Sequence, residues 1–191
     1  METKKKIIVF AGPSGVGKST LANILLHNSD TCEFSISATT RSIRLGEKHG
    51  ENYYYFSEEE FKQRIETEDF LEWEEVYPNT FYGTLRSEVA RINGLGRVAV
   101  FDVDVLGAVN IKKQFGDKAH LVFIKPESTE ALKERLRERG TESDEQTEIR
   151  ISRFEKELAY EDQFDQVIMN TTGDIKSASD KIMEIAKTYC S

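Results

Sequence analysis

The 191-residue sequence has little of the features that mark several other classes of protein. No apolar run approaches the ~18 residues that a membrane-spanning helix needs. The apolar run that follows the basic residues 4–6 stops at Ala11, which is too short for a signal peptide. With 38% hydrophobic and 31% charged residues, the composition is typical of a globular domain, and we expect a cytoplasmic protein without a membrane partner.

Basic residues are outnumbered by acidic ones, with 26 Lys and Arg against 34 Asp and Glu and a net charge of −8. Binding to nucleic acid in bulk requires a basic face, so we expect no nucleic-acid partner. Any anion that this protein binds must be held by a local group of donors. The sequence makes no prediction of oligomeric state.

Cysteine and histidine are also scarce. Cys32 and Cys190 are far apart and match no metal-binding or redox spacing, so we expect free thiols in a reducing compartment. The three histidines, His27, His49 and His120, form no catalytic group, and we expect each to be structural or solvated.

Four short runs of β-branched and aromatic residues predict strands that are buried on both faces, because polar residues do not alternate within them. They lie at 6–12, 98–104, 120–126 and, with a weaker pattern, 165–170. Helical patterns lie at 18–28, 105–116, 128–140 and 174–189. This alternation predicts a three-layer α/β fold with a parallel sheet at its core.

Two segments interrupt the alternation. Residues 37–85 are rich in Arg, Tyr, Glu and Gly, and contain a helix whose start is marked by the capping box Ser57…Glu60. Residues 139–148 are polar, contain Gly140, and lie between two charged helices. We expect one domain over 1–191, with its core at 1–36, 86–134 and 160–191, an insertion at 37–85 and a small helical lid at 135–159.

The stretch "GPSGVGKS" matches the phosphate-loop motif G-x-x-x-x-G-K-[ST], and it directly follows a buried strand and opens a helix. Lys18 should reach the β- and γ-phosphates of ATP, and the Ser19 hydroxyl should bind Mg²⁺ directly. Asp102 should support the ion through water. The remaining residues that we expect to line the ATP site are Gly12, Pro13, Ser14, Gly15, Val16, Gly17 and Thr20.

A GTPase is disfavoured. Residues 104–107 match the D-x-x-G motif of GTPases, but no N-K-x-D motif for guanine selection occurs in the chain.

Arginine and tyrosine residues concentrate in the insertion. Arg41 and Arg44 can each offer a bidentate fork to a phosphate, and Tyr53 and Tyr82 can add hydroxyl donors. This predicts a second phosphate site, and hence a kinase for a small phosphorylated acceptor. The alternative is that the arginines are solvated and the tyrosines form a local core.

The sequence resembles the guanylate kinase family, a family of P-loop nucleoside monophosphate kinases, over nearly the whole chain. The motifs that carry the resemblance are "GPSGVGKST", "FSISATTRSIRLGE", "FLEWEEV", "FYGT", "FDVDVLG", "LRERGTE" and "VIMN". The resemblance implies transfer of the ATP γ-phosphoryl group to GMP, giving ADP and GDP, with Mg²⁺ as cofactor. The chain departs from the family at Ile43, where proline is usual, at Asn52, where aspartate is common, and at Leu106, where glutamine is usual.

The resemblance also implies a role for individual residues. The catalytic set comprises Lys18, Arg44, Arg139 and Arg150, the last two being lid arginines that close over the transferring group. Asn170 lies near the adenine. The GMP phosphate is clamped by Arg41, Arg44, Tyr53 and Tyr82. The guanine is read by Ser37, Glu72, Thr84 and Asp104.

The chemistry of GMP agrees with these roles. Guanine presents an N–H and an amino group side by side, and one carboxylate, such as that of Glu72, can accept from both. The alternative is a solvated strand glutamate beside Glu74 and Glu75. No general base is needed, because a nucleotide phosphate has a second pKa near ~6 and is already a nucleophile at neutral pH.

Two other functions remain open from the sequence. One is a kinase for a related acceptor, either another nucleoside monophosphate or a ribose phosphate. The other is a non-catalytic module that binds phosphorylated peptides, although such modules usually lack an intact phosphate loop, which is present here.

Overall fold

The computed structural model of the chain describes residues 7–138 and 144–190. At its centre is a five-stranded parallel sheet with the strand order β2-β7-β1-β8-β9. Every residue of the central strand β1 is buried, as predicted for a strand that is covered on both faces. The strands are β1 (Ile7–Ala11), β2 (Cys32–Phe34), β7 (Val98–Asp102), β8 (Ala119–Lys125) and β9 (Gln166–Met169).

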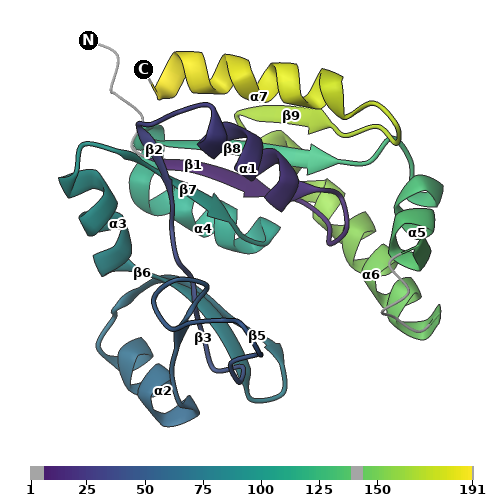
Figure 1. Cartoon of the computed structure of the whole chain (residues 1–191). Helices are drawn as coiled ribbons and strands as arrows, with labels where there is room; N and C mark the ends of the chain where they lie inside the picture. Colours follow the sequence, from purple (N-terminus) through teal and green to yellow (C-terminus); the bar gives the residue numbers. More distant parts are fainter. Residues whose placement is uncertain (1–6, 139–143, 191) are drawn as a thin grey trace.

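Helices cover both faces of this sheet and complete three layers (Figure 1). Helices α1 (Lys18–His27) and α7 (Ile175–Tyr189) pack on the face that carries Ile8 and Phe10. Helices α3 (Arg86–Gly94) and α4 (Val105–Phe115) pack on the opposite face. The 3-10 helix Gly116–Lys118 follows α4 directly, and the 3-10 helix Leu158–Gln163 packs Leu158 and Tyr160 against the hydrophobic cluster on this face. The predicted α/β fold with a parallel core is confirmed.

A second sheet, with the order β4-β3-β6-β5, lies below the first in Figure 1. Helix α2 (Glu58–Glu66) covers it by packing Phe61 between Phe70 and Phe81. The predicted capping box starts this helix, because Ser57 and Glu60 each accept the other's backbone N–H. The strands are β3 (Ala38–Thr39), β4 (Tyr54–Tyr55), β5 (Phe70–Tyr77) and β6 (Thr80–Leu85).

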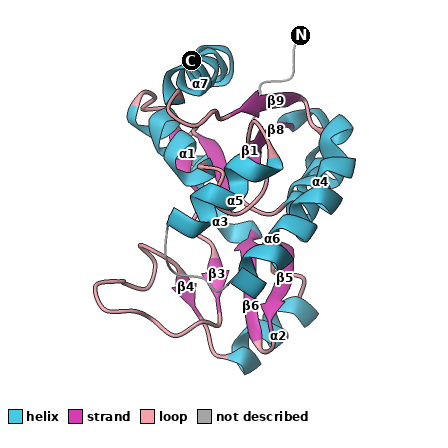
Figure 2. Cartoon of the chain, turned by 90° about the vertical axis from the view of Figure 1, so that its right-hand side faces the viewer, coloured by secondary structure: helices cyan, strands magenta, loops and turns pink. Residues whose placement is uncertain are grey.

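Helices α5 (Thr129–Glu138) and α6 (Asp144–Glu157) project at the carboxyl ends of the parallel strands (Figures 1 and 2). They pack on each other through Leu132, Leu136, Ile151 and Phe154. Crevices at the carboxyl ends of parallel strands are where α/β folds bind ligands. The division of the chain into a core, an insertion and a lid, with the residue boundaries given above, stays a prediction. No helix in the described parts of the chain has the length and apolar character to cross a membrane.

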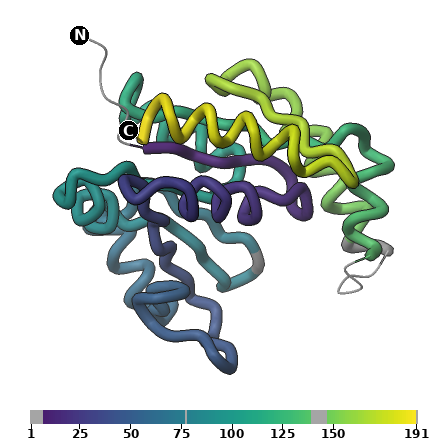
Figure 3. The backbone as a smooth tube through the Cα atoms, turned by 45° about the horizontal axis from the view of Figure 1, so that its top comes forward, coloured from purple at the N-terminus to yellow at the C-terminus, as the bar shows by residue number. Residues whose placement is uncertain are grey.

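A disulfide joins the two cysteines, so the expectation of free thiols was wrong. Helix α7 runs beside α1 (Figure 3) and ends over the edge strand β2, where Cys190 and Cys32 have Cα atoms 6.1 Å apart. Both residues are buried. Because 158 residues separate them along the chain, no local spacing in the sequence indicates the contact.

Candidate active site

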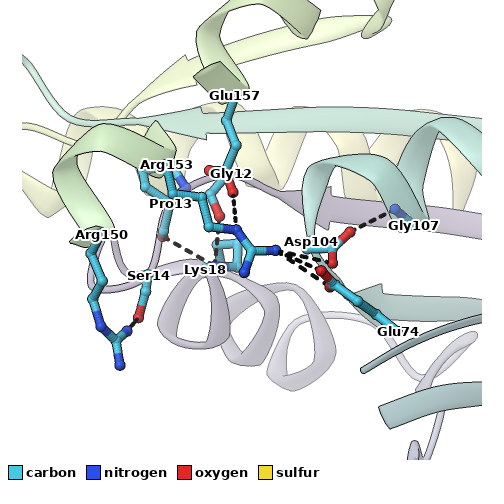
Figure 4. A network of polar contacts seen from close by, with 10 residues as sticks. All are labelled: Gly12, Pro13, Ser14, Lys18, Glu74, Asp104, Gly107, Arg150, Arg153 and Glu157. Carbon is cyan, nitrogen blue, oxygen red and sulfur yellow. Dashed lines mark hydrogen bonds and ion pairs between the residues drawn. The ribbon is translucent and has the colours of Figure 1, made fainter. Parts of the chain in front are cut away.

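The phosphate loop connects β1 to α1 and requires glycine for steric reasons. Gly12 has a φ of 138°, and a Cβ on it would lie 2.1 Å from the Ile124 carbonyl oxygen of the neighbouring strand. Lys18 turns back into the loop, where its ammonium donates to the carbonyl oxygens of Gly12 at 2.9 Å and Pro13 at 3.1 Å (Figure 4). The start of α1 has no side-chain cap, so its first N–H groups face the loop as a site for an anion.

Ser19 and Asp102 meet beside this loop because β1 and β7 are neighbouring strands. The Ser19 hydroxyl donates to Asp102 Oδ2 at 2.6 Å, and Lys18 Nζ lies 3.9 Å from Asp102 Oδ1. A hydroxyl and a carboxylate are hard oxygen ligands of the kind that Mg²⁺ prefers, and a Mg²⁺ ion that binds nucleotide takes few protein ligands. The residues present therefore fit this ion.

A cavity of about 650 Å³ extends from the phosphate loop to the second sheet. Residues of the phosphate loop line one end of the cavity, and carboxylates and tyrosines line the other. The predicted site residues among its walls are Ser14, Lys18, Ser37, Tyr53, Glu72, Tyr82, Asp102, Asp104 and Arg150.

Glu72 lies on β5 opposite Thr84 of β6, and the buried Thr84 hydroxyl donates to Glu72 Oε1 at 2.6 Å. The carboxylates of Glu72 and Asp104 approach each other at Gly107, where a Cβ would lie 3.1 Å from Glu72 Oε2 and 3.2 Å from Asp104 Oδ1. Burial raises the pKa of Glu72 to about 7, against the hydrogen bond from Thr84, and the Asp104 charge adds to the rise. Glu72 is thus a carboxylate held in a confined pocket, unlike a solvated strand glutamate.

Three of the four residues predicted to clamp a phosphate come together. The Arg41 guanidinium lies 5.4 Å from the centre of the Tyr53 ring, and the rings of Tyr53 and Tyr82 are 6.0 Å apart. Arg41 also donates two hydrogen bonds to Glu47, at 2.8 and 3.0 Å, and this contact lowers the pKa of Glu47 to about 2. Arg44 differs, because its backbone N–H donates to Glu47 at 2.8 Å while its side chain is exposed.

Helix α6 reaches the phosphate loop, since Arg150 donates to the Ser14 hydroxyl (Figure 4). On the far side of the loop, Asn170 donates to the Val16 carbonyl oxygen at 2.7 Å. Arg139, the other predicted lid arginine, lies outside the described residues. Thr20 is exposed on α1.

Two arginines in this region were given no role by the sequence prediction. Arg135 donates to the Asn170 carbonyl oxygen at 2.6 Å and lines a second hollow of about 390 Å³ beside Val16 and Gly17. Arg153 lines the main cavity. The sequence did contain a signal for Arg153. It follows Arg150 by three residues, and residues three apart lie on the same face of a helix, so both can face the site.

A phosphate loop on a parallel sheet, facing an acceptor pocket on a second sheet, defines the class of the protein as a P-loop phosphotransferase. The family model for guanylate kinase matches residues 4–189. The chain is 45% identical to a guanylate kinase of Bacteroides fragilis over 184 residues, which cover 96% of this chain and 89% of that one. It is 48% identical to a guanylate kinase of Porphyromonas gingivalis over 166 residues, 86% of this chain and 88% of the relative.

Among solved structures, the crystal structure of guanylate kinase from Anaplasma phagocytophilum has a TM-score of 0.71 at 29% identity. The similarity covers 99% of this chain and 88% of that chain. This chain belongs to the guanylate kinase family.

Proposed function

We propose that the protein transfers the γ-phosphoryl group of ATP to GMP, forming ADP and GDP. The observation that carries this proposal is that Lys18 of the phosphate loop and the confined carboxylate of Glu72 line opposite ends of the same cavity. A carboxylate can accept from both the ring N–H and the amino group of guanine, whereas adenine does not present that pair. Ser37, Thr84 and Asp104 complete the guanine pocket in this proposal.

The reaction then depends on positioning and charge. The amides of the phosphate loop and Lys18 hold the β- and γ-phosphates, while Arg41, Arg44, Tyr53 and Tyr82 hold the phosphate of GMP. An oxygen of the GMP phosphate attacks the γ-phosphorus, and the bond from that phosphorus to the β,γ-bridging oxygen breaks. The electron pair leaves on ADP. No protein group has to remove a proton, because the attacking oxygen is already ionised at neutral pH.

Ser19 and Asp102 are the residues that would hold Mg²⁺, Ser19 directly and Asp102 through water. When bound, the ion would supply positive charge that offsets the negative charge of the triphosphate. Arg150 and Arg139 would neutralise charge on the transferring group, and Asn170 would lie near the adenine. The proposal includes a role in purine nucleotide metabolism and a cytoplasmic location.

The experiment is an acceptor panel in a coupled assay of ADP release, with GMP, dGMP, AMP, UMP and ribose bisphosphate each supplied with ATP and Mg²⁺. The proposal expects GMP to give the highest kcat/KM by at least about 100-fold over AMP. A higher value for AMP, UMP or the ribose phosphate would contradict it.

A further inference from the structure

Arg153 extends from α6 across the acceptor end of the cavity and contacts two other parts of the molecule (Figure 4). Its Nη2 atom lies 3.2 Å from Glu74 Oε1 on β5 and 3.4 Å from Asp104 Oδ2, at the start of α4. Its Nε atom donates to Glu157 at 3.1 Å, one turn later on α6. One guanidinium therefore joins the lid helix, the second sheet and the parallel core.

We propose that Arg153 is a positioning residue for the acceptor nucleotide, which balances the carboxylates of the pocket and orients Asp104 toward the guanine. This inference rests on the proposed phosphorylation of GMP. It assigns to Arg153 a part in acceptor binding that is separate from the phosphate-directed part of Arg150.

The charges around Arg153 support this role. Glu72, Glu74, Asp104 and Glu157 all line the cavity, and the acceptor that must enter it is itself an anion. Contact with Asp104 raises the pKa of Glu74 to about 7, with burial adding to the rise, and the Arg153 charge opposes it. Without Arg153, these carboxylates would lose the cation that contacts Glu74, Asp104 and Glu157, and like charges repel strongly in a partly buried site.

The geometry around Asp104 supports the orienting role. Asp104 Oδ1 accepts the Gly107 backbone N–H at 2.6 Å and caps α4, while Oδ2 faces Arg153. Each carboxylate oxygen thus has its own donor, and the plane of the group is set. An ion pair elsewhere on the surface would not orient a pocket residue, because neither of its partners would line the cavity.

The test compares Arg153→Gln, Arg153→Lys and the double variant Glu74→Gln/Arg153→Gln with the wild type. Glutamine keeps much of the length of arginine but removes the charge. Arg97→Gln is the matched control, because its side chain is 47% exposed against 46% for Arg153 and pairs with Glu33 at 2.6 Å, at the edge of the sheet. Steady-state kinetics with GMP and ATP are combined with calorimetric titration of GMP and with melting temperatures.

We expect Arg153→Gln to raise the KM and Kd for GMP about tenfold, with the KM for ATP changed less than about twofold. Arg153→Lys should restore most of the affinity. The double variant should bind GMP at least about threefold more tightly than Arg153→Gln, because a negative charge is removed together with its partner. If Arg153 acted only by packing, the additional Glu74→Gln substitution would not restore affinity for GMP.

The outcomes separate this inference from the proposed function. A wild type that does not phosphorylate GMP contradicts the function, while the calorimetric titration still tests Arg153. If Arg153→Gln matches Arg97→Gln in its affinity for GMP, or if the double variant is as weak as Arg153→Gln, the role assigned to Arg153 is wrong.

Discussion

The Thr84 hydroxyl and the Glu72 carboxylate are joined across two antiparallel strands by a hydrogen bond of 2.6 Å. This bond fixes one carboxylate oxygen and orients the group in the cavity that Lys18 lines at its other end. The specificity that we propose depends on this pair, because guanine and adenine differ at the edge that a carboxylate can recognise.

Replacing Glu72 with glutamine should damage guanine selection. The amide keeps an acceptor for Thr84 but places a donor where the guanine N–H groups need an acceptor. Charge-assisted hydrogen bonds contribute roughly 1.5–3 kcal/mol each, so kcat/KM for GMP should fall on the order of 10²-fold. The measurement is the ratio of kcat/KM for GMP to that for AMP, and an unchanged ratio would show that Glu72 does not read the base.

The raised pKa of Glu72 predicts a pH dependence. Its pKa of about 7 in the free protein means that the carboxyl group is protonated, and cannot accept from both guanine donors, as the pH falls below 7. The value of kcat/KM for GMP reports groups of the free protein and should therefore decrease as the pH is lowered from 8 to 6. In Glu72→Gln, the decrease should be smaller, because the contribution of Glu72 is lost while that of the GMP phosphate, near pH ~6, remains. Identical profiles for both proteins would contradict the assignment.

Arg41 and Arg44 should act on GMP and not on ATP. Each substitution by alanine should raise the KM for GMP by at least about tenfold, because it removes a fork of charged donors from the phosphate. Lysine should restore little, since a point charge does not reproduce the fork. Titration of each variant with GMP and with an unreactive ATP analogue is the measurement. Equal losses for the two ligands would refute this division of roles.

Arg150 should act mainly in the transition state. Its contact with Ser14 places the guanidinium at the phosphate loop, so Arg150→Ala should lower kcat by roughly 10²–10⁴ with a modest change in nucleotide affinity. Ser14→Ala is the control, because it removes the hydroxyl contact and leaves the arginine. If the two variants lose the same activity, Arg150 acts only through Ser14.

The disulfide predicts a stability that depends on redox conditions. It closes a loop of 158 residues, and a bridge of this kind typically contributes about 2–4 kcal/mol to the free energy of unfolding. A reducing agent should therefore lower the melting temperature of the wild type but not that of Cys190→Ser. Labelling of both thiols by an alkylating agent in the unreduced, unfolded protein would show that the bridge does not form.

The parallel sheet could be predicted because each of its longer strands is an apolar run without polar alternation. The phosphate loop could be predicted because its glycines and Lys18 are close together in the chain. Strand β2 could not be predicted, since its three residues include Glu33 and show no strand pattern. The contacts of Arg153 and the bridge between Cys32 and Cys190 were also missed. Both join segments that only tertiary packing brings together, so no spacing in the sequence indicates them.

The sequence prediction also did not assign Glu74, the partner of Arg153, to the cavity. Glu74 follows Glu72 by two residues, so the alternation of a strand places both on one face. That signal was present, but a run of acidic residues is also typical of a solvated strand. Only the position of β5 against α4 and α6 distinguishes the two cases.

Phosphoryl transfer to GMP can be followed with ATP that carries a radioactive γ-phosphate, in the presence of GMP and Mg²⁺. We expect labelled GDP in amounts equal to the ADP formed, and none with Lys18→Ala. Label that appears only in inorganic phosphate, or in an acceptor other than GMP, would contradict the proposed function.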